Sequence, residues 1–368
     1  MINLSELASA IVEKKASGIL IKKPANIFFI TNFSAGGYLY FSASGETILY
    51  TDARYSERAA NECFGHIKIV KIKDVFKDIA ADILSILSSA SFPSVLFESD
   101  YITYDEYKSF AKLLGNRFNF IPAEGFLSKI RSVKDKKELD YIIEAVSVSE
   151  KAIMDMLKEI AYNNETGGIS EKKASSIYKK NLLDFYSDES FETIVLSGRN
   201  SSIPHGLPSA DKKIAKRGVL LCDFGAEING YKSDETFTVH LGKPDKKFLD
   251  VYDAVYTAQQ KAISKIKPGI KFSFLDKIAR DYIEKRGYGK YFTHSLGHGV
   301  GLDIHEYPFI GKKNNDTVKE GMVFTVEPGV YLEGEFGVRI EDMCYVEREG
   351  ARIITRIKKN NHNIEDLL

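Results

Sequence analysis

The sequence predicts a two-domain protein of the mixed α/β (α+β) class, in which a small mixed-sheet domain precedes a larger α+β domain. At about 150 residues per domain, 368 residues correspond to roughly two domains. Helix and strand patterns alternate along the first third of the chain, whereas strands dominate much of the second half. Hydrophobic residues make up 44% and charged residues 28%, which is typical of a globular protein with a sizeable core.

The first domain is predicted to combine helices with one mixed sheet. Apolar residues at helical spacing predict helices over Leu4–Lys15, Val75–Leu87 and Tyr104–Leu114. Aromatic and β-branched runs predict strands over Gly18–Ile21, Ile27–Thr31, Tyr38–Phe41, Thr47–Tyr50, Ser94–Phe97 and Phe118–Ile121. A loosely patterned stretch between Pro122 and Lys136 separates this domain, residues 1–128, from the second, residues 135–368.

The second domain is predicted to begin with a long helix, preceded by a capping box over Ser132–Asp135. An apolar stripe runs along this helix at three- and four-residue spacing from Leu139 to Ile160. Further helices are predicted over Ile169–Phe185, Lys246–Ile266 and Phe272–Lys285. Strands are predicted over Thr193–Ser197, Val219–Phe224 and Tyr231–Leu241, and again within Met322–Ile354.

Charge, hydropathy and cysteine usage disfavour several classes of protein. Fifty-one basic residues balance fifty-one acidic ones, so the chain lacks the positive field of a general nucleic-acid binder. No apolar run is long enough to span a membrane, and charges interrupt the N-terminal segment where a secretion signal would be apolar. Cys63, Cys222 and Cys344 are widely spaced and odd in number, which favours a reducing compartment. We therefore expect a cytoplasmic protein that binds neither nucleic acid nor membranes.

A segment rich in histidine and glycine is the first candidate for a functional site. It contains His294, His298 and His305 within twelve residues, together with three glycines that allow close backbone approach. The segment matches neither a phosphate-binding P-loop nor the H-E-x-x-H zinc pattern. Another histidine, His205, follows Pro204 in a loop after a predicted strand. Histidines that only satisfy hydrogen bonds in the core are the simpler alternative.

Four carboxylates lie in or beside apolar strand patterns, where a lone buried charge is costly. They are Asp223, Asp234, Glu327 and Glu341. A turn over 227–230 can bring the first two onto neighbouring strands, where a cation between them would relieve their repulsion. Arg339 lies two residues before Glu341, so both share one face of a strand. Such an oxygen-rich set with one histidine nitrogen favours Mn²⁺, Co²⁺ or Fe²⁺ over structural zinc.

The residues that carry these patterns occur in the order Asp223, Asp234, His298, Glu327 and Glu341, with His205, His294, His305 and Arg339 around them. This ordered set resembles the pita-bread metallopeptidases, among them Xaa-Pro dipeptidase (prolidase) and aminopeptidase P. The resemblance extends over nearly the whole chain. It implies a creatinase/prolidase-type N-terminal domain, a pita-bread catalytic domain from about residue 135, and a homodimer.

Residue by residue, the resemblance implies a site for two divalent metal ions, most simply Mn²⁺ or Co²⁺, with Fe²⁺ and Zn²⁺ as alternatives. The implied ligands are Asp223, Asp234, His298, Glu327 and Glu341, of which Asp234 and Glu341 would bridge both ions. His205 and His305 would contact substrate and stabilise the tetrahedral intermediate, Arg339 would orient the bridging carboxylates or relay protons, and His294 would line the pocket. A hydroxide that bridges the two metal ions would attack the carbonyl preceding proline, and Glu327 would transfer the proton.

Three functions remain open at this point. A dipeptidase would cleave Xaa-Pro itself, whereas an aminopeptidase P would release the first residue of longer Xaa-Pro peptides. Similar compact dipeptidases often have an arginine, suited to a substrate carboxylate, at the position where this chain has Phe309. A non-catalytic binding protein is the third possibility, and relatives of that kind typically lose metal ligands, all five of which are present here.

Overall fold

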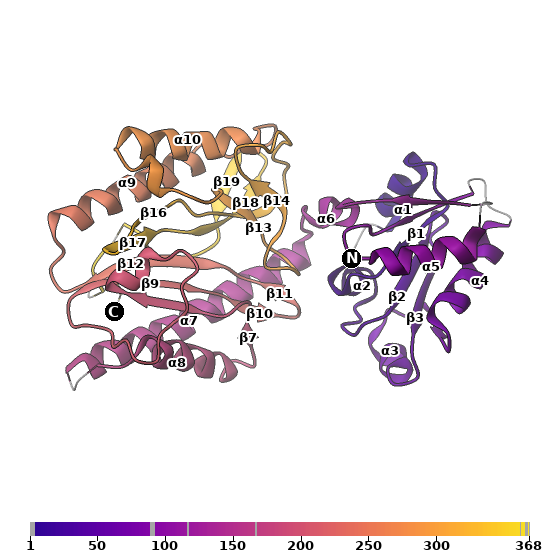
Figure 1. The fold of residues 1–368 in the computed structure, drawn as a ribbon, viewed down its shortest axis with the longest axis horizontal. Coiled ribbons are helices and arrows are strands. Elements are labelled where there is room, and N and C mark those ends of the chain that lie inside the picture. The colour runs from indigo at the N-terminus through magenta and orange to yellow at the C-terminus, as the bar shows by residue number, and fades with distance from the viewer. Residues whose placement is uncertain are drawn as a thin grey trace. The chain divides into compact units, whose positions relative to one another are not determined.

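The computed structural model describes residues 4–88, 93–115, 118–165, 168–360, 362–364 and 367, and the chain forms two compact units, Met1–Ile130 and Arg131–Leu368. The first unit is built on a six-stranded sheet in the order β4-β3-β2-β1-β5-β6 (Figure 1). Its strands are β1 (Gly18–Ile21), β2 (Tyr38–Ser42), β3 (Thr47–Thr51), β4 (Lys68–Lys71), β5 (Ser94–Phe97) and β6 (Asn119–Pro122). Strand β1 pairs antiparallel with β2 and parallel with β5, so the predicted mixed sheet is present.

Helices accompany this sheet, and two of them, over Val75–Leu87 and Tyr104–Leu114, pack apolar faces against it. The helices of this unit are α1 (Leu4–Glu13), α2 (Pro24–Thr31), α3 (Ser56–Glu62), α4 (Val75–Leu87), α5 (Tyr104–Leu114) and α6 (Phe126–Arg131), the last of which ends at the boundary between the units. Helices α4 and α5 have the predicted bounds because each begins at a side-chain cap. Asp74 accepts a hydrogen bond from the Lys77 backbone N–H, and Thr103 and Glu106 form a capping box.

The strand predicted over Ile27–Thr31 is wrong, because this segment belongs to helix α2. Pro24 occupies the first turn, where its fixed φ favours a helix and its missing N–H costs nothing. Buried Glu98 accepts hydrogen bonds from the backbone N–H groups of Lys22 and Lys23, both at 2.7 Å, and from the Asn26 side chain. A carboxylate from a distant part of the chain therefore caps a segment whose β-branched and aromatic residues favour a strand.

The second unit begins with the long helix α7 (Lys136–Glu165), as predicted. Its capping box differs from the predicted one. The Asp135 backbone N–H donates to Glu138 at 2.8 Å, and the Glu138 N–H donates back to Asp135 at 2.9 Å, so the box begins at Asp135 and not at Ser132. The other helices are α8 (Glu171–Leu183), α9 (Lys246–Ile263) and α10 (Phe272–Lys285), with short 3₁₀ turns η2 (Gly198–Ser202) and η3 (Gly289–Tyr291).

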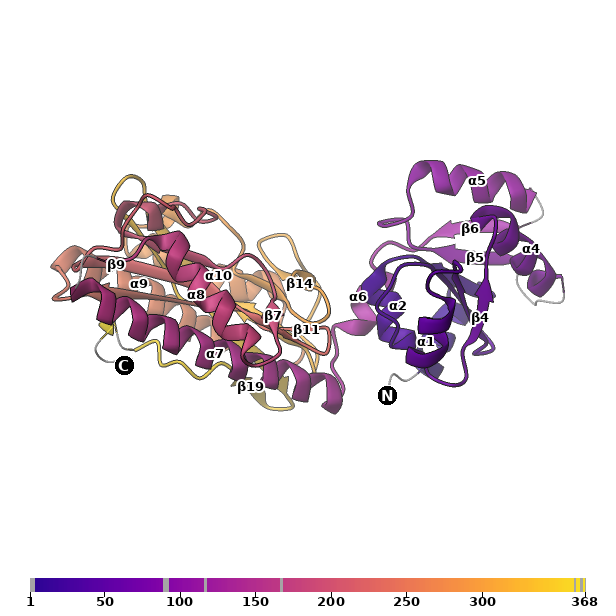
Figure 2. The ribbon, with the colours of Figure 1, turned by 90° about the horizontal axis from the view of Figure 1, so that it is seen from below.

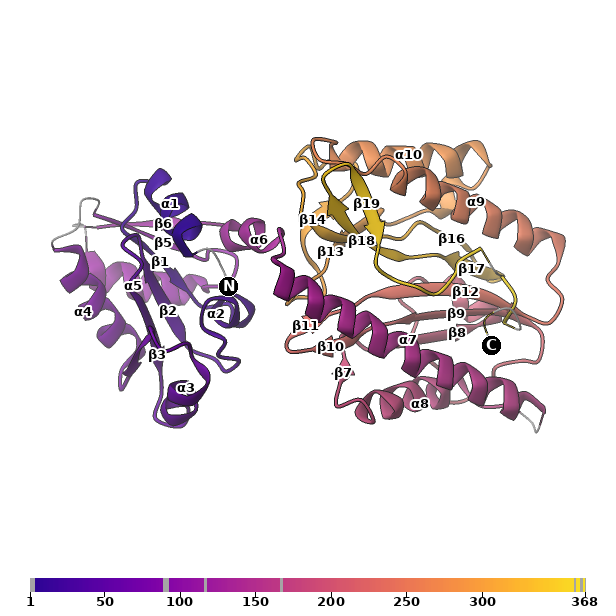
Figure 3. The ribbon, with the colours of Figure 1, turned by 180° about the vertical axis from the view of Figure 1, so that it is seen from behind.

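The strands of the second unit lie between two pairs of helices, with α9 and α10 on one side and α7 and α8 on the other (Figures 1 and 3). Figure 2 shows α7 and α8 side by side. The strands before α9 are β7 (Asp188–Glu189), β8 (Ile194–Ser197), β9 (Gly218–Phe224), β10 (Ala226–Ile228), β11 (Tyr231–Lys232) and β12 (Glu235–Leu241). Those after α10 are β13 (Gly297–Gly299), β14 (Glu306–Ile310), β15 (Val323–Val326), β16 (Gly329–Leu332), β17 (Phe336–Arg339), β18 (Asp342–Glu347) and β19 (Gly350–Ile353).

These strands form several small sheets with separate hydrophobic cores on their two sides. The sheet β14-β13-β15-β18-β19 and the hairpin β16-β17 pack on α9 and α10, whereas the sheet β12-β9-β8 packs on α7 and α8. The sheets meet where the backbone N–H of Glu341 donates to the carbonyl of Thr236 at 3.0 Å. Within the part of the chain that the structure describes, no helix is long and apolar enough to cross a membrane.

Candidate active site

All ten side chains that the sequence singles out line one cavity of about 320 Å³ in the second unit. They are His205, Asp223, Asp234, His294, His298, His305, Phe309, Glu327, Arg339 and Glu341. They come from the loop after η2, from β9 and the residue before β12, from the segment that leads through β13 to β14, and from the β15–β18 region. The fold thus brings together residues that lie far apart in sequence.

Asp223 and Asp234 lie on adjacent antiparallel segments, as the turn after β10 predicts. In the register of β9 and β12, Asp223 pairs with Thr236, two residues beyond Asp234. The predicted strand over Tyr231–Leu241 is interrupted at Ser233 and Asp234, which separate β11 from β12. The Asp234 backbone N–H donates to the Met343 sulfur at 3.2 Å instead of continuing a ladder, and the residue is 4% exposed.

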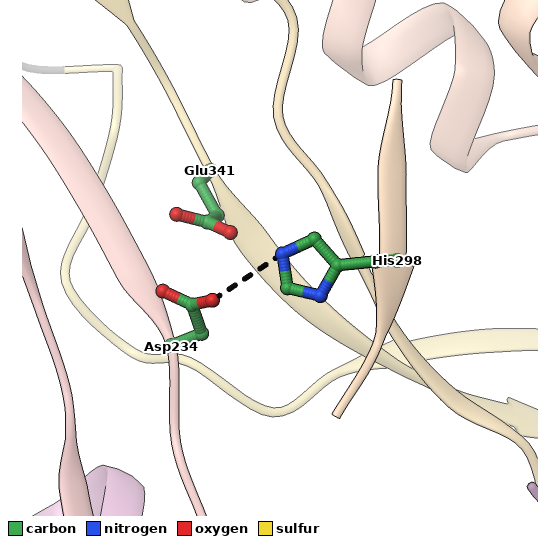
Figure 4. Close-up of side chains that lie close together, drawn as sticks. All are labelled: Asp234, His298 and Glu341. Carbon is green, nitrogen blue, oxygen red and sulfur yellow. Dashed lines mark ion pairs between the residues drawn. The ribbon is translucent and has the colours of Figure 1, made fainter. Parts of the chain in front are cut away.

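Asp234, His298 and Glu341 form a cluster whose potential ligand atoms all lie within 4.8 Å of one another (Figure 4). The Nε2 atom of His298 lies 3.5 Å from Asp234 Oδ2 and 3.3 Å from Glu327 Oε1. Its Nδ1 lies 3.1 Å from the carbonyl oxygen of Gly299, which can only accept, so Nδ1 carries the proton. That contact leaves Nε2 facing the carboxylates, where it donates to Glu327 when the imidazole is protonated and offers its lone pair to a metal ion when it is neutral.

Threonine hydroxyls hold two of the carboxylates. Thr236 donates to Glu341 at 2.7 Å and Thr325 donates to Glu327 at 3.2 Å. Glu341 was predicted to share a strand with Arg339, but β17 ends at Arg339 and Glu341 lies in the two-residue link before β18. Both side chains still reach the cavity.

Burial and mutual repulsion shift the pKa values of these carboxyl groups. Burial raises the pKa of Asp234 and of Glu341 well above the ordinary range, and neighbouring carboxylates raise both further. Burial also raises the pKa of Asp223, although the Arg339 guanidinium, 2.5 Å away, opposes this shift. For Glu327, the hydrogen bond with His298 and nearby positive charge outweigh the effect of burial and lower the pKa to about 2.

This donor set fits divalent cations. Among the described residues, the buried Oδ1 atom of Asp223 has no hydrogen-bond partner. Of the described residues that line the cavity, Arg339 alone carries a permanent positive charge, against four carboxylates. Oxygen-rich sites with one imidazole suit Mn²⁺, Fe²⁺ or Co²⁺, and a cation between the carboxylates would remove the repulsion that raises their pKa values.

Three further histidines provide hydrogen-bonding groups around the cluster. The rings of His298 and His305 meet edge to face with centroids 4.3 Å apart. Burial lowers the pKa of His294, and burial together with His298 lowers that of His305, so both imidazoles are neutral at neutral pH. His205 and His305 are exposed at the cavity, where a substrate can reach them.

Comparison with known proteins identifies the family. Residues 140–348 match the model of Metallopeptidase family M24, and residues 4–133 match that of the Creatinase/Prolidase N-terminal domain. The chain belongs to metallopeptidase family M24. This M24 chain thus combines a creatinase-like N-terminal domain with a pita-bread domain, as the resemblance in the sequence implies.

Relatives of this M24 chain match it over nearly its full length. It is 32% identical to an Xaa-Pro dipeptidase of Pyrococcus furiosus over 97% of this chain and 98% of that protein. The solved structure of an Xaa-Pro dipeptidase from Bacillus anthracis is 33% identical, with a TM-score of 0.89 and coverage of 97% and 98%. The structure of an X-Pro aminopeptidase from Thermotoga maritima MSB8 is 29% identical, with a TM-score of 0.85 and coverage of 98% and 99%.

The sequence analysis missed Tyr331, a second group that organises the site of this M24 chain. Its hydroxyl accepts from Arg339 at 2.9 Å and lies 3.0 Å from Nε2 of His294. Arg339 also donates to Asp223, to the carbonyl of Pro204 and to Thr236, so at least four of its five N–H groups are engaged. In the hairpin β16–β17, Tyr331 opposes Gly337 on the same face as Arg339, and this period-two relation is the signal that could have identified it.

Proposed function

We propose that this M24 metallopeptidase hydrolyses the Xaa-Pro bond of dipeptides with two divalent cations. Asp223, Asp234, His298, Glu327 and Glu341 would hold the ions, and Asp234 and Glu341 would be shared between the two. The observation that carries the proposal is the convergence of Asp234, His298 and Glu341 within 4.8 Å, in a cavity that Asp223 and Glu327 also line. Relatives that cover nearly the whole chain are Xaa-Pro dipeptidases, which supports the choice of substrate.

When bound, two such cations lower the pKa of a water molecule and polarise the carbonyl oxygen of the scissile bond. Glu327 is a carboxylate at neutral pH, because its pKa is not raised as those of Asp234 and Glu341 are, and it can accept the proton of the attacking water. The same carboxyl group then gives that proton to the leaving nitrogen of proline. His205 and His305 stand at the cavity to donate N–H groups to the substrate carbonyl as negative charge develops on its oxygen.

The remaining groups position these residues. Arg339 holds Asp223 through the ion pair at 2.5 Å and is itself fixed by Tyr331, which also contacts His294. We propose Mn²⁺ or Co²⁺ as the working metal, with Fe²⁺ and Zn²⁺ as alternatives, because the donors are mainly oxygens. We also propose a cytoplasmic homodimer. The family resemblance supports the dimer, and the three unpaired cysteines suit a reducing compartment.

Aminopeptidase P activity is the second candidate, and Phe309 favours it. This side chain lines the cavity and is 54% exposed, but it has no hydrogen-bond donor for the carboxylate of a dipeptide. A non-catalytic binding role is less well supported, because all four carboxylates and His298 line the cavity together. The similarity to an X-Pro aminopeptidase from Thermotoga maritima is compatible with either peptidase activity.

Mass spectrometry of the products from Ala-Pro, Ala-Pro-Ala and a longer Xaa-Pro peptide, each with added Mn²⁺ or Co²⁺, tests the proposal. A dipeptidase releases alanine and proline from Ala-Pro and acts poorly on the longer peptides. Efficient release of alanine from the longer peptides alone would make the chain an aminopeptidase P. Cleavage of none of them, in protein with verified metal content, would contradict both assignments.

A further inference from the structure

Two buried carboxylates lie directly next to the proposed bridging ligands. Glu235 follows Asp234 at the start of β12, and Asp342 follows Glu341 at the start of β18. They are 1% and 4% exposed, and neither is among the described residues that line the cavity. Glu235 contacts Lys359, and Asp342 contacts Lys359 and Gln259, so these two carboxylates point away from the cavity that Asp234 and Glu341 face.

Lys359, in the segment after β19, contacts both of these carboxylates on the side that faces away from the cavity. Its ammonium group donates to Glu235 and, at 2.9 Å, to Asp342, while its side chain is only 2% exposed. Its carbonyl oxygen accepts from the Tyr252 hydroxyl at 2.9 Å, which fixes this part of the chain on α9. One cation therefore ties together the two segments that carry the proposed bridging ligands.

The other contacts around this group show how strongly the connection depends on Lys359. Asp342 has two further donors, Thr355 at 2.6 Å and Gln259 at 3.0 Å. Glu235 differs, because among the described residues its Oε2 atom is buried without a hydrogen-bond partner and its Oε1 atom contacts Lys359. Among the described residues, Lys359 is thus the side chain that fixes the Glu235 carboxylate. The Asp342 carboxylate would stay fixed without Lys359, because Thr355 and Gln259 also donate to it.

We propose that Lys359 is a positioning residue for the metal centre, which holds Asp234 and Glu341 at the spacing needed to share two ions. This inference rests on the proposed function, because it assumes that those carboxylates bridge the metals. The ammonium group contacts no described residue of the cavity by hydrogen bond, so it acts through the backbone of β12 and β18. Groups that orient metal ligands in this way typically change metal affinity by about 10–100-fold.

The double variant Lys359→Met/Glu235→Gln removes the connection without changing the net charge, and Asp342 keeps its hydrogen bonds from Thr355 and Gln259. A matched control is Arg356→Met/Glu150→Gln. Arg356 lies three residues before Lys359 and pairs with Glu150 of α7 at 2.8 Å, so this control loosens the same C-terminal segment while the hydrogen bonds from Lys359 to Glu235 and Asp342 stay in place. Each chelator-treated, full-length protein is titrated with Mn²⁺ in a calorimeter, and circular dichroism of the metal-free protein confirms folding.

We expect the wild-type protein to bind two ions and the double variant to bind the weaker one about 10-fold less tightly or worse. The control variant should bind both ions with wild-type affinity. Wild-type Mn²⁺ binding by the folded double variant would overturn the role of Lys359 and leave the proposed function intact. Failure of the wild-type protein itself to bind Mn²⁺, Co²⁺, Fe²⁺ or Zn²⁺ would instead overturn the proposed function and this inference with it.

If the double variant does not fold, Glu235→Gln alone tests the same connection, because it replaces the ion pair with Lys359 by at most a neutral hydrogen bond while Lys359 remains paired with Asp342. The charge-matched control is Glu150→Gln. A weaker second Mn²⁺ site in Glu235→Gln, but not in Glu150→Gln, supports the positioning role. Equal affinities in these two variants would overturn it.

Discussion

The Phe309→Arg substitution should raise the preference of the enzyme for dipeptide substrates over tripeptides. Phe309 lies on β14 opposite His298 and lines the cavity. Of the described residues around that cavity, only Arg339 has a permanent positive charge, and its guanidinium is already engaged by Asp223 and Tyr331. The carboxylate of a bound dipeptide therefore has no cation of its own here, and an arginine at position 309 would supply one.

The size of the effect follows from the exposure of this position. A hydrogen bond to a charged group is worth about 1.5–3 kcal/mol, and a position that is 54% exposed should give the lower end of that range. A gain of about 1.5 kcal/mol corresponds to roughly a tenfold rise in the ratio of kcat/KM for Ala-Pro over Ala-Pro-Ala. The uncharged control Phe309→Met should leave the ratio unchanged. An unchanged ratio in Phe309→Arg as well would show that this side chain does not face the substrate carboxylate.

Other expected effects separate ligands, catalytic groups and stabilising groups. Asp234→Ala and Glu341→Ala should lower bound metal, measured by elemental analysis, as well as rate; full metal content in either would contradict a ligand role. His205→Ala should keep its metal but lose about 10²-fold in kcat, which is the effect of losing one hydrogen-bond donor to the transition state. An unchanged kcat in this variant would show that His205 is not an active-site residue. In the first unit, hydrogen bonds from Lys22, Tyr38 and Thr103 outweigh burial and lower the pKa of Glu106 to about 2 from 4.5. Because this folded-state pKa is depressed, the stabilisation is present above pH 4.5 and is lost as the pH falls toward 2. Glu106→Gln should therefore cost about 1–2 kcal/mol in urea unfolding at neutral pH, less than the full pKa shift because water screens this group, and almost nothing near pH 2; a pH-independent difference would contradict this assignment.

Local signals in the sequence were sufficient to predict most helices and strands. Helices α4 and α5 begin at Asp74 and Thr103, whose side chains cap them regardless of the rest of the fold. Helix α2 could not be predicted in this way, because the cap that fixes it comes from Glu98, far along the chain. The break between β11 and β12 also depends on a distant residue, because the Asp234 backbone N–H donates to the Met343 sulfur and not to a neighbouring strand.

The same distinction applies to the site. Acids such as Asp223 and Glu327 were identifiable because a carboxylate within an apolar strand is costly unless something compensates it. Tyr331 and Lys359 carry no such signal, because a tyrosine in a strand and a lysine near a chain end are ordinary residues. Their importance arises only from the partners that the fold provides, Arg339 and His294 for the tyrosine, and Glu235 and Asp342 for the lysine.

Hydrolysis of Ala-Pro by protein whose metal has been removed and verified absent by elemental analysis tests the central claim most directly. The four carboxylates and His298 of the cavity are expected to act only with divalent cations between them. The account predicts no hydrolysis by the metal-free protein and recovery of activity when Mn²⁺ or Co²⁺ is added back. Undiminished hydrolysis of Ala-Pro by the verified metal-free protein would contradict it.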